Sequence, residues 1–266
     1  MSVTLIIPAR YASSRFPGKP LSPLKGASGE AKSLIQRSWE AAQEVNGVDH
    51  CFVATDDDRI AEATRAFGGE VVMTPEACAN GTERCAAAII GMDPEPEIVI
   101  NLQGDAPLTP PWFVEALIEA MQADAALQVS TPVLRCDAEA LAGFKADRKA
   151  GRVGGTTAVF DQTGRALYFS KEVIPYTGDG AVAVEPCPVF HHVGVYGYRP
   201  AALRAYSEMT PGMLEELEGL EQLRFMEHGL PVQCVEVEAR GAAFWELNNP
   251  EDTARVEAVL RARGLA

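Results

Sequence analysis

The residues best suited to chemistry begin with a short loop of fixed positive charge. Arg10, Arg15 and Lys19 recur within ten residues. Residues 1–29 contain no Asp or Glu, although the chain average of 37 acids in 266 residues would place about four there. Three cations with no acid beside them in the sequence suit a polyphosphate, because one acidic group would not need all three. The loop is therefore interpreted as a phosphate site.

Two common nucleotide motifs do not fit this loop. A P-loop requires Ser or Thr after its lysine, and Pro20 follows Lys19. The loop also lacks the G-x-G-x-x-G pattern of a dinucleotide fingerprint. An ordinary basic surface loop would mix its charges with acids, so the phosphate interpretation is favoured.

A carboxylate follows another apolar run of the sequence. Asp105 ends the segment Gln103-Gly104-Asp105, directly after the run at 98–102. A carboxylate at a strand end can hold Mg²⁺ between two phosphates of a nucleotide. It can also do no more than open the turn that follows. The cationic loop favours the metal interpretation.

Two other polar segments have both a chemical and a structural interpretation. The three acids at 56–58 invite a metal site, but one of them is expected to cap a helix at 58–67. Residues 80–84 open a further helix, where a glycine and a hydroxyl can bind an anion or a base edge. Capping by Asn80 or by Thr82 explains the same pattern.

His191 and His192 precede an expected strand at 193–198. Adjacent strand residues point to opposite faces, so the two imidazoles cannot chelate one metal. One of them is expected to contact a ligand.

A later stretch, 214–227, is expected to be one amphipathic helix with a buried apolar stripe and a solvated polar face. The stripe would contain Leu214, Leu217, Leu220 and Leu223, and the polar face Glu215, Glu218, Gln222 and Arg224.

Apolar periodicity predicts the elements that position these groups. In the first half, strands are expected at 3–7, 51–54, 70–73 and 98–102, and helices at 33–45, 58–67, 81–92 and 110–121. This alternation is typical of a parallel sheet with helices on both faces. Ligands of such sheets bind beyond the carboxyl ends of the strands, so the loops there are the candidates for a site. These loops are at 8–20, 55–58, 74–80 and 103–109.

The alternation ends near residue 125. Strands are then expected at 129–134, 193–198 and 232–237, with a hairpin formed by 156–160 and 166–169. A final helix is expected at 249–263, with Asn249 as its cap and Pro250 as its first residue. The interpretation is one α/β domain, residues 1–266, with an antiparallel excursion in its second half, because no linker forces a division.

Composition excludes several classes of protein. The net charge of −14 argues against a general binder of nucleic acid or of membrane surfaces. The six cysteines show neither C-x-x-C nor zinc spacing, so free thiols and a cytoplasmic location are expected. The sequence shows no signal peptide and no apolar run near the ~20 residues of a spanning helix.

An ordered set of motifs resembles the 3-deoxy-D-manno-octulosonate (Kdo) cytidylyltransferase family. The motifs are PARYASSRFPGKP (8–20), VATD (53–56), GTER (81–84), QGD (103–105), ALYFS (166–170), HVGVYGYR (192–199) and LEQLR (220–224). The resemblance implies a GT-A-like (Rossmann-like) nucleotidyltransferase, dependent on Mg²⁺ and homodimeric. The implied reaction couples CTP to Kdo and gives CMP-Kdo and pyrophosphate, for lipopolysaccharide or capsule synthesis.

The resemblance also implies roles for individual residues. Arg10, Arg15 and Lys19 would hold the triphosphate, and Asp105 would hold the metal. Lys19, Arg10 and Asp105 are the expected catalytic residues. Other expected substrate contacts are Ser13, Ser14, Arg84, Gln103, Lys171, His192, Tyr196, Glu221 and Gln222. Residues 1–125 would form the nucleotide-binding half, and 126–266 the half for sugar binding and dimerisation.

The chain departs from the family pattern in places that bear on the site. Asn248 stands where the family has a metal-binding Asp; an amide oxygen can ligate, but without charge. Glu246 would share a strand face with Asn248 if the strand continues, and could supply that charge. Lys171 and His191 stand where the family tends to have Arg. A different acidic sugar, amino-Kdo-like or sialic-acid-like, is therefore an alternative substrate, and a catalytically impaired nucleotide-binding paralogue is another alternative.

Overall fold

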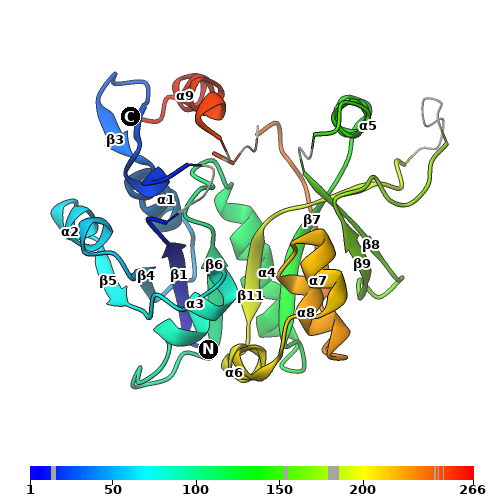
Figure 1. Cartoon of the computed structure of the whole chain (residues 1–266), viewed down its shortest axis with the longest axis horizontal. Helices are drawn as coiled ribbons and strands as arrows, with labels where there is room; N and C mark the ends of the chain where they lie inside the picture. Colours follow the sequence, from blue (N-terminus) through cyan, green and yellow to red (C-terminus); the bar gives the residue numbers. More distant parts are fainter. Residues whose placement is uncertain (13–15, 153–154, 179–185, 243, 245, 248) are drawn as a thin grey trace.

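The structure is a computed structural model that describes residues 1–12, 16–152, 155–178, 186–242, 244, 246–247 and 249–266. Its frame is a ten-stranded mixed sheet with helices packed around it (Figure 1). The sheet order is β5-β4-β1-β6-β11-β7-β10-β8-β9, and β12 also pairs with β7. The α/β class expected from the sequence is confirmed.

The first part of the sheet is parallel, as the alternation of strands and helices predicted. Its strands are β1 (Val3–Ala9), β4 (His50–Thr55), β5 (Glu70–Met73) and β6 (Ile98–Leu102). The helices that connect and follow them are α1 (Leu34–Gln43), α2 (Asp58–Ala66), α3 (Gly81–Ala88) and α4 (Pro111–Ala123). A small hairpin of β2 (Pro23–Lys25) and β3 (Ala31–Ser33) and a 3₁₀ turn at Lys19–Leu21 precede α1.

Alternating side chains of β1 feed two apolar cores, one on each face of the sheet. Leu5 and Ile7 are fully buried in the core that includes α1 and α4 residues. Ile6 points the other way, into the core that includes residues of α3. A strand buried on both faces reads as a continuous apolar run, which is the pattern of residues 3–7.

The second part of the sheet is mostly antiparallel. Its strands are β7 (Val129–Arg135), β8 (Thr156–Phe160), β9 (Ala166–Ser170), β10 (Phe190–His192), β11 (Val195–Tyr198) and β12 (Gln233–Val237). Strand β11 lies antiparallel between β6 and β7, which joins the two parts into one sheet. The helices are α5 (Ala138–Lys149), α6 (Pro200–Glu208), α7 (Met213–Glu218), α8 (Gln222–Glu227) and α9 (Thr253–Ala262).

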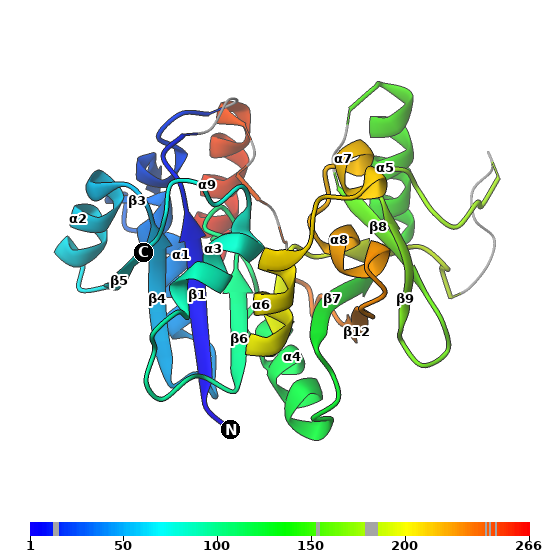
Figure 2. The same cartoon turned by 60° about the horizontal axis from the view of Figure 1, so that its bottom comes forward.

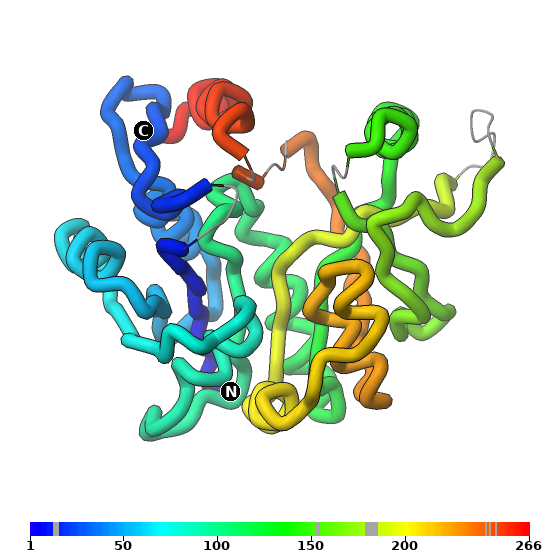
Figure 3. The backbone as a smooth tube through the Cα atoms, viewed as in Figure 1, coloured from blue at the N-terminus to red at the C-terminus, as the bar shows by residue number. Residues whose placement is uncertain are grey.

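Helix α6 packs against α3, so the two parts of the chain also meet on one face of the sheet (Figure 2). After β12 the chain returns to the N-terminal part, where α9 contacts β2 (Figure 3). The Lys25 amide donates to Glu257 of α9 at 2.9 Å. Among the described helices, none combines the length and the apolar character that a membrane crossing requires.

The expected single helix at 214–227 is wrong. Gly219 adopts φ +61°, a left-handed conformation that ends α7, and α8 begins at Gln222. The amphipathic assignment also fails, because Leu217 is 75% exposed whereas Gln222 and Arg224 are buried. The polar residues of α8 face the interior because they meet polar partners from other elements there, which a hydropathy pattern does not record.

Other boundaries differ less. The strand expected at 193–198 begins two residues later, as β11 at Val195, and the two histidines before it belong to a separate strand, β10. The final helix opens with a 3₁₀ turn at Pro250–Asp252, and Asn249 caps it in a capping box with Asp252. The sequence predicted neither α5 nor α6, and the helix expected at 81–92 ends at Ala88.

Candidate active site

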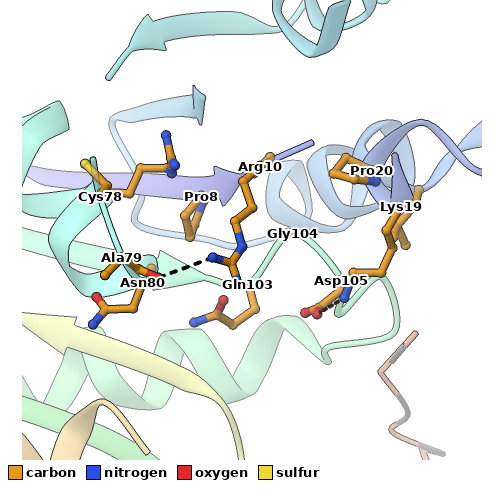
Figure 4. Close-up of a pocket in the computed structure, with 14 residues that line it drawn as sticks. Pro8, Arg10, Lys19, Pro20, Cys78, Ala79, Asn80, Gln103, Gly104 and Asp105 are labelled. Carbon is orange, nitrogen blue, oxygen red and sulfur yellow. Dashed lines mark hydrogen bonds and ion pairs between the residues drawn. The ribbon is translucent and has the colours of Figure 1, made fainter. Parts of the chain in front are cut away.

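The loops after β1 and β6 enclose a cavity of about 250 Å³ at the carboxyl edge of the parallel strands (Figure 4). This is the edge at which ligands bind in open α/β sheets. The polar side chains that line the cavity are Arg10, Lys19, Asn80, Arg84, Gln103 and Asp105. The structure therefore brings together the cationic loop, the start of α3 and the Gln103–Asp105 turn.

Lys19 and Asp105 form an ion pair in the cavity. The Lys19 ammonium donates to Asp105 Oδ2 at 2.5 Å, and the side chains are 16% and 25% exposed (Figure 4). The cationic loop thus has an acidic partner, which comes from 86 residues later in the chain. The residue expected to bind phosphate and the residue expected to bind the metal therefore neutralise each other's charge.

Arg10 lies on the opposite side of the cavity from this pair. Its guanidinium donates to the Ala79 carbonyl at 3.3 Å, just before α3 (Figure 4). Arg10 is exposed, so its remaining donors are open to a ligand. The other residues expected in the phosphate loop, Ser13, Ser14 and Arg15, lie outside the described residues.

Close packing of the backbone sets the position of Asp105. A Cβ on Gly104 would lie 2.8 Å from the Pro8 carbonyl oxygen, so a side chain at 104 would push the turn away from β1. The Ala106 amide closes the turn by donating to Gln103 at 3.1 Å. The Asp105 carbonyl accepts from the Leu247 amide at 2.9 Å, which ties the segment before the final helix to the cavity.

Glu246 and Leu247 lie outside the described strands, so the condition on which a shared strand face with residue 248 depended is not met at these two residues. The Glu246 carboxylate points toward the start of β11, since Glu246 Oε1 would lie 3.3 Å from a Cβ on Gly194. Burial, with the nearby charges of Glu221 and Glu246, raises the pKa of Tyr196 well above its usual value. Asn248 lies outside the described residues.

The donor chemistry at this edge fits a magnesium ion. Within the described part of the chain, no group of three His, Cys, Asp or Glu side chains converges as a metal cage. Mg²⁺ does not need one, because it binds through one or two carboxylates and completes its shell with waters and substrate phosphates. Asp105 in the turn after β6, and Glu246 next to the Leu247 amide that bonds the Asp105 carbonyl, are carboxylates of the kind that such a site uses.

Helix caps account for two polar segments. Asn80 caps α3 by accepting from the Glu83 amide at 2.9 Å, while Thr82 Oγ1 is buried against the Tyr198 hydroxyl at 2.8 Å. Asn80 rather than Thr82 is therefore the cap. In the acidic triplet, Asp57 caps α2, as expected, by accepting from the Arg59 amide at 3.0 Å.

Arg84 lines the cavity but is engaged elsewhere. Its side chain is buried, and its guanidinium pairs with Asp56 Oδ1 at 3.0 Å and donates to Thr74 Oγ1 at 2.6 Å. These bonds use two of the residues that follow β4 and β5. Arg84 therefore anchors the wall of the cavity, and a substrate contact by this residue remains a prediction.

Glu221 connects the cavity to the second part of the chain. Its carboxylate accepts from the Thr82 amide at 2.9 Å and from Gln103 Nε2 at 3.3 Å. Burial raises the pKa of Glu221, and the hydrogen bond from Thr82 opposes that shift. Gln103 and Glu221, both expected substrate contacts, are thus adjacent although 118 residues separate them.

A second group of expected substrate contacts lies around β11. Gln222 Oε1 accepts from the Tyr196 hydroxyl at 3.0 Å, and His192 Nε2 lies 3.0 Å from Thr131 Oγ1. The rings of His192 and Tyr196 are 5.6 Å apart. Burial, with a smaller effect from the His191 charge, lowers the pKa of His192 to about 3, so its imidazole is neutral near pH 7.

The two histidines point to opposite faces, as their adjacency on a strand predicted. His191 packs against Phe144 and Phe244 at centroid distances of 5.1 and 6.0 Å. Burial lowers its pKa to about 4. Lys171 follows β9, where its amide donates to Glu218 of α7 at 2.9 Å.

Asn101 is a candidate site residue that motif reasoning missed; its Nδ2 would lie 3.3 Å from a Cβ on Gly81, which lines the cavity. It is fully buried on β6, and neither its amide nitrogen nor its carbonyl oxygen has a hydrogen-bond partner among the described residues. In register it faces Tyr196 across the β6–β11 ladder. Buried polar groups are nearly always bonded, so an unbonded one beside a cavity marks a place for a ligand or water. The signal in the sequence is one amide inside the apolar run at 98–102.

Comparison with known proteins then decides the family. The cytidylyltransferase family model matches residues 4–236. The 3-deoxy-manno-octulosonate cytidylyltransferase of Maricaulis maris is 44% identical over 264 residues, which cover 99% of both chains. The chain belongs to the 3-deoxy-manno-octulosonate cytidylyltransferase family. A mitochondrial 3-deoxy-manno-octulosonate cytidylyltransferase of Arabidopsis thaliana is 38% identical, with 98% of this chain and 84% of the relative covered.

Solved structures support the same assignment. A CMP:2-keto-3-deoxy-manno-octonic acid synthetase complexed with CTP has a TM-score of 0.83 and 36% identity, and 98% of each chain is covered. A 4-diphosphocytidyl-2C-methyl-D-erythritol synthase from Anaerococcus prevotii has a TM-score of 0.56 at 12% identity, which shows a shared fold alone. As a 3-deoxy-manno-octulosonate cytidylyltransferase family member, the chain is a nucleotidyltransferase, as the motifs implied.

Proposed function

We propose that this chain transfers the CMP part of CTP to Kdo and releases pyrophosphate. One observation carries the proposal. The hydrogen bond between Gln103 and Glu221, at 3.3 Å, joins the cavity lined by cations to the helix whose next residue, Gln222, bonds Tyr196 of β11. A nucleotidyltransferase needs that arrangement, because its acceptor must lie beside the α-phosphate. The full-length likeness to a synthetase complexed with CTP supports cytidine as the base.

The reaction needs positioning and charge neutralisation more than covalent help. The sugar hydroxyl attacks the α-phosphorus, the bond from that phosphorus to the bridging oxygen breaks, and pyrophosphate leaves with the electron pair. The hydroxyl proton is lost to solvent or to a nearby base. Arg10 and Lys19 line the cavity and neutralise charge that develops on the leaving group. Lys19 must exchange its Asp105 partner for phosphate when CTP binds.

Asp105 and Glu246 are the residues that would hold Mg²⁺. A bound Mg²⁺ supplies charge stabilisation at the phosphates and lowers the pKa of a hydroxyl near it. The close approach of Gly104 to the Pro8 carbonyl sets the turn that places Asp105 at the edge of the sheet. The missing charge at position 248 makes Glu246 the candidate for the second ligand.

The groups around β11 suit a polyhydroxylated sugar acid. Neutral His192, Tyr196 and Gln222 offer hydrogen bonds without a fixed charge, and the Gln222 amide nitrogen has no partner among the described residues. Such uncharged donors and acceptors are suited to sugar hydroxyls. Lys171 is a half-buried cation directly after β9 and is the proposed partner for the sugar carboxylate.

The decisive experiment measures pyrophosphate release with Mg²⁺ for CTP, UTP and GTP, each combined with Kdo, an amino-Kdo and a sialic acid. We expect CTP with Kdo to give the highest kcat/KM. Faster turnover of another sugar acid would transfer the proposal to that substrate. Nucleotide binding without turnover of any pair would instead indicate the impaired paralogue.

A homodimer and a cytoplasmic location remain predictions. The sheet path ends at β9, and Leu167 on that strand is 60% exposed, while Tyr176 beyond it is 88% exposed. Exposed apolar side chains near an unpaired strand edge are suited to a second copy of the chain. Light scattering on the purified protein tests the dimer.

All six cysteines are free thiols in the structure, which supports a reducing compartment.

A further inference from the structure

We infer that Arg224 is a positioning residue. It holds α8, with Glu221 and Gln222, against the start of α3, so that the two substrates meet in one fixed geometry. The inference rests on the proposed function for its substrates. Its physical basis is a buried network of ion pairs that joins α8 to α3. The residues of this network are not among the expected substrate contacts.

Arg224 is 3% exposed, and each of its three guanidinium nitrogens donates to a protein carboxylate. Its Nε and Nη2 donate to the two oxygens of Glu215 at 2.6 and 2.7 Å. Its Nη1 donates to Glu83 Oε1 at 2.9 Å. The guanidinium carbon also lies 4.1 Å from the ring centroid of Tyr206. A planar fork that serves two carboxylates and one ring requires arginine, because lysine cannot reproduce these directions.

The contact with Glu83 crosses between the two parts of the chain, since the partners are 141 residues apart. The second oxygen of Glu83 accepts from the Ala79 amide at 2.8 Å. The Ala79 carbonyl in turn accepts from Arg10. Arg224 is therefore connected, through the Glu83 carboxylate and the backbone of Ala79, to a cation of the phosphate cavity.

The sugar side is connected to Arg224 by its own helix. Glu221 and Gln222 lie within one turn before Arg224, so the angle at which α8 docks on α3 sets the positions of both side chains. Glu221 then bonds the Thr82 amide, and Gln222 bonds Tyr196. If the Arg224–Glu83 contact is lost, α8 retains its fold through Glu215 but loses one of its two polar attachments to α3.

Glu83→Gln is the sharpest test, because it removes the charge that links the parts while Arg224 keeps its bidentate bond to Glu215. Initial rates are measured over a grid of CTP and Kdo concentrations. We expect kcat/KM for the sugar to fall about tenfold, while the Kd for CTP without sugar changes less than threefold. Arg224→Lys, which keeps the charge but not the fork, should reproduce the same split with a larger loss.

Glu227→Gln is the matched control. Glu227 is exposed and bonds the Leu214 and Glu215 amides within the α7–α8 unit, without touching α3. Its kcat/KM for the sugar should stay within twofold of the wild type. Equal losses for the sugar and for CTP in Glu83→Gln, or equal effects of Glu83→Gln and Glu227→Gln, would overturn the inference and leave Arg224 a structural residue only.

Hydrogen–deuterium exchange separates this inference from the proposed function, because it needs no substrate. Peptides that cover 220–228 should exchange faster in Glu83→Gln than in the wild type, and those that cover 129–135 should not change. Unchanged exchange at 220–228 would refute the link even if the enzyme uses CTP and Kdo. If the wild type prefers another sugar acid, the same rate comparison is made with that substrate.

Discussion

The ion pair between Lys19 and Asp105 predicts two opposite effects of one substitution. Asp105→Asn keeps the shape of the side chain and removes its charge. We expect it to lower turnover at least 100-fold, because the carboxylate proposed to hold Mg²⁺ is lost. We also expect it to tighten the binding of CTP in the absence of metal, because Lys19 is released from its internal partner and an anion that repels the phosphates is removed.

The size of the second effect follows from the environment of the pair. The two atoms are 2.5 Å apart and the side chains are 16% and 25% exposed, so the pair is neither at the surface nor fully buried. Exposed pairs are worth up to about 1 kcal/mol, and breaking a fully buried pair costs about 3–5 kcal/mol. A value of about 1–2 kcal/mol is appropriate here, which corresponds to a Kd for CTP about 5- to 30-fold lower.

Isothermal titration of CTP in EDTA measures this Kd, and pyrophosphate release with Mg²⁺ measures turnover. Glu236→Gln is the control. Glu236 forms an exposed ion pair with Arg135 outside the cavity, and its substitution changes the net charge by the same amount as Asp105→Asn. Weaker or unchanged CTP binding by Asp105→Asn in EDTA would refute the reasoning. Unaltered turnover and Mg²⁺ dependence would reduce Asp105 to a turn residue.

Three further predictions concern other parts of the molecule. Glu246→Gln should raise the Mg²⁺ concentration for half-maximal rate at least fivefold by removing a ligand charge, and a metal titration with an unchanged midpoint would contradict it. The lowered pKa of His191, about 4, means that the unfolded chain binds its proton first, so stability falls as the pH drops from about 6.5 toward 4. Urea unfolding between pH 6 and 5 should therefore show a shallower decline for His191→Phe, by up to about 1.4 kcal/mol per pH unit. Gly219→Ala should cost about 1 kcal/mol and lower Tm by about 2–4 °C, because residue 219 has φ +61°; calorimetry with no change would contradict this.

The parallel part of the fold could be predicted because its signals are local. Strands β5 and β6 have the boundaries that the apolar runs gave, and Asp57 and Asn249 cap helices as expected. Burial of β1 on both faces produces a run in which every residue from 3 to 7 except Thr4 is apolar. Each of these features depends on residues that are close to one another in the sequence, and a sequence pattern records only such local relations.

The second part depends on partners that are distant in the sequence. The polar residues of α8 are buried because Glu83 and Thr82, some 140 positions earlier, bond Arg224 and Glu221. A periodicity argument assigns such residues to solvent. Likewise, the cationic loop has no acid within its own stretch, yet Lys19 meets Asp105 through the turn after β6. The site residues were identifiable by type and motif, but their internal pairing was not.

The continuity of the sheet through β11 has a mechanical consequence. Because β11 is hydrogen-bonded to β6 on one side and to β7 on the other, continuous ladders of backbone hydrogen bonds hold the two parts of the sheet together. Rotating the two parts away from each other would break the backbone hydrogen bonds between β6 and β11. Because the relative position of the two parts is set when the chain folds, aligning two substrates across these strands would cost less entropy at the time of binding.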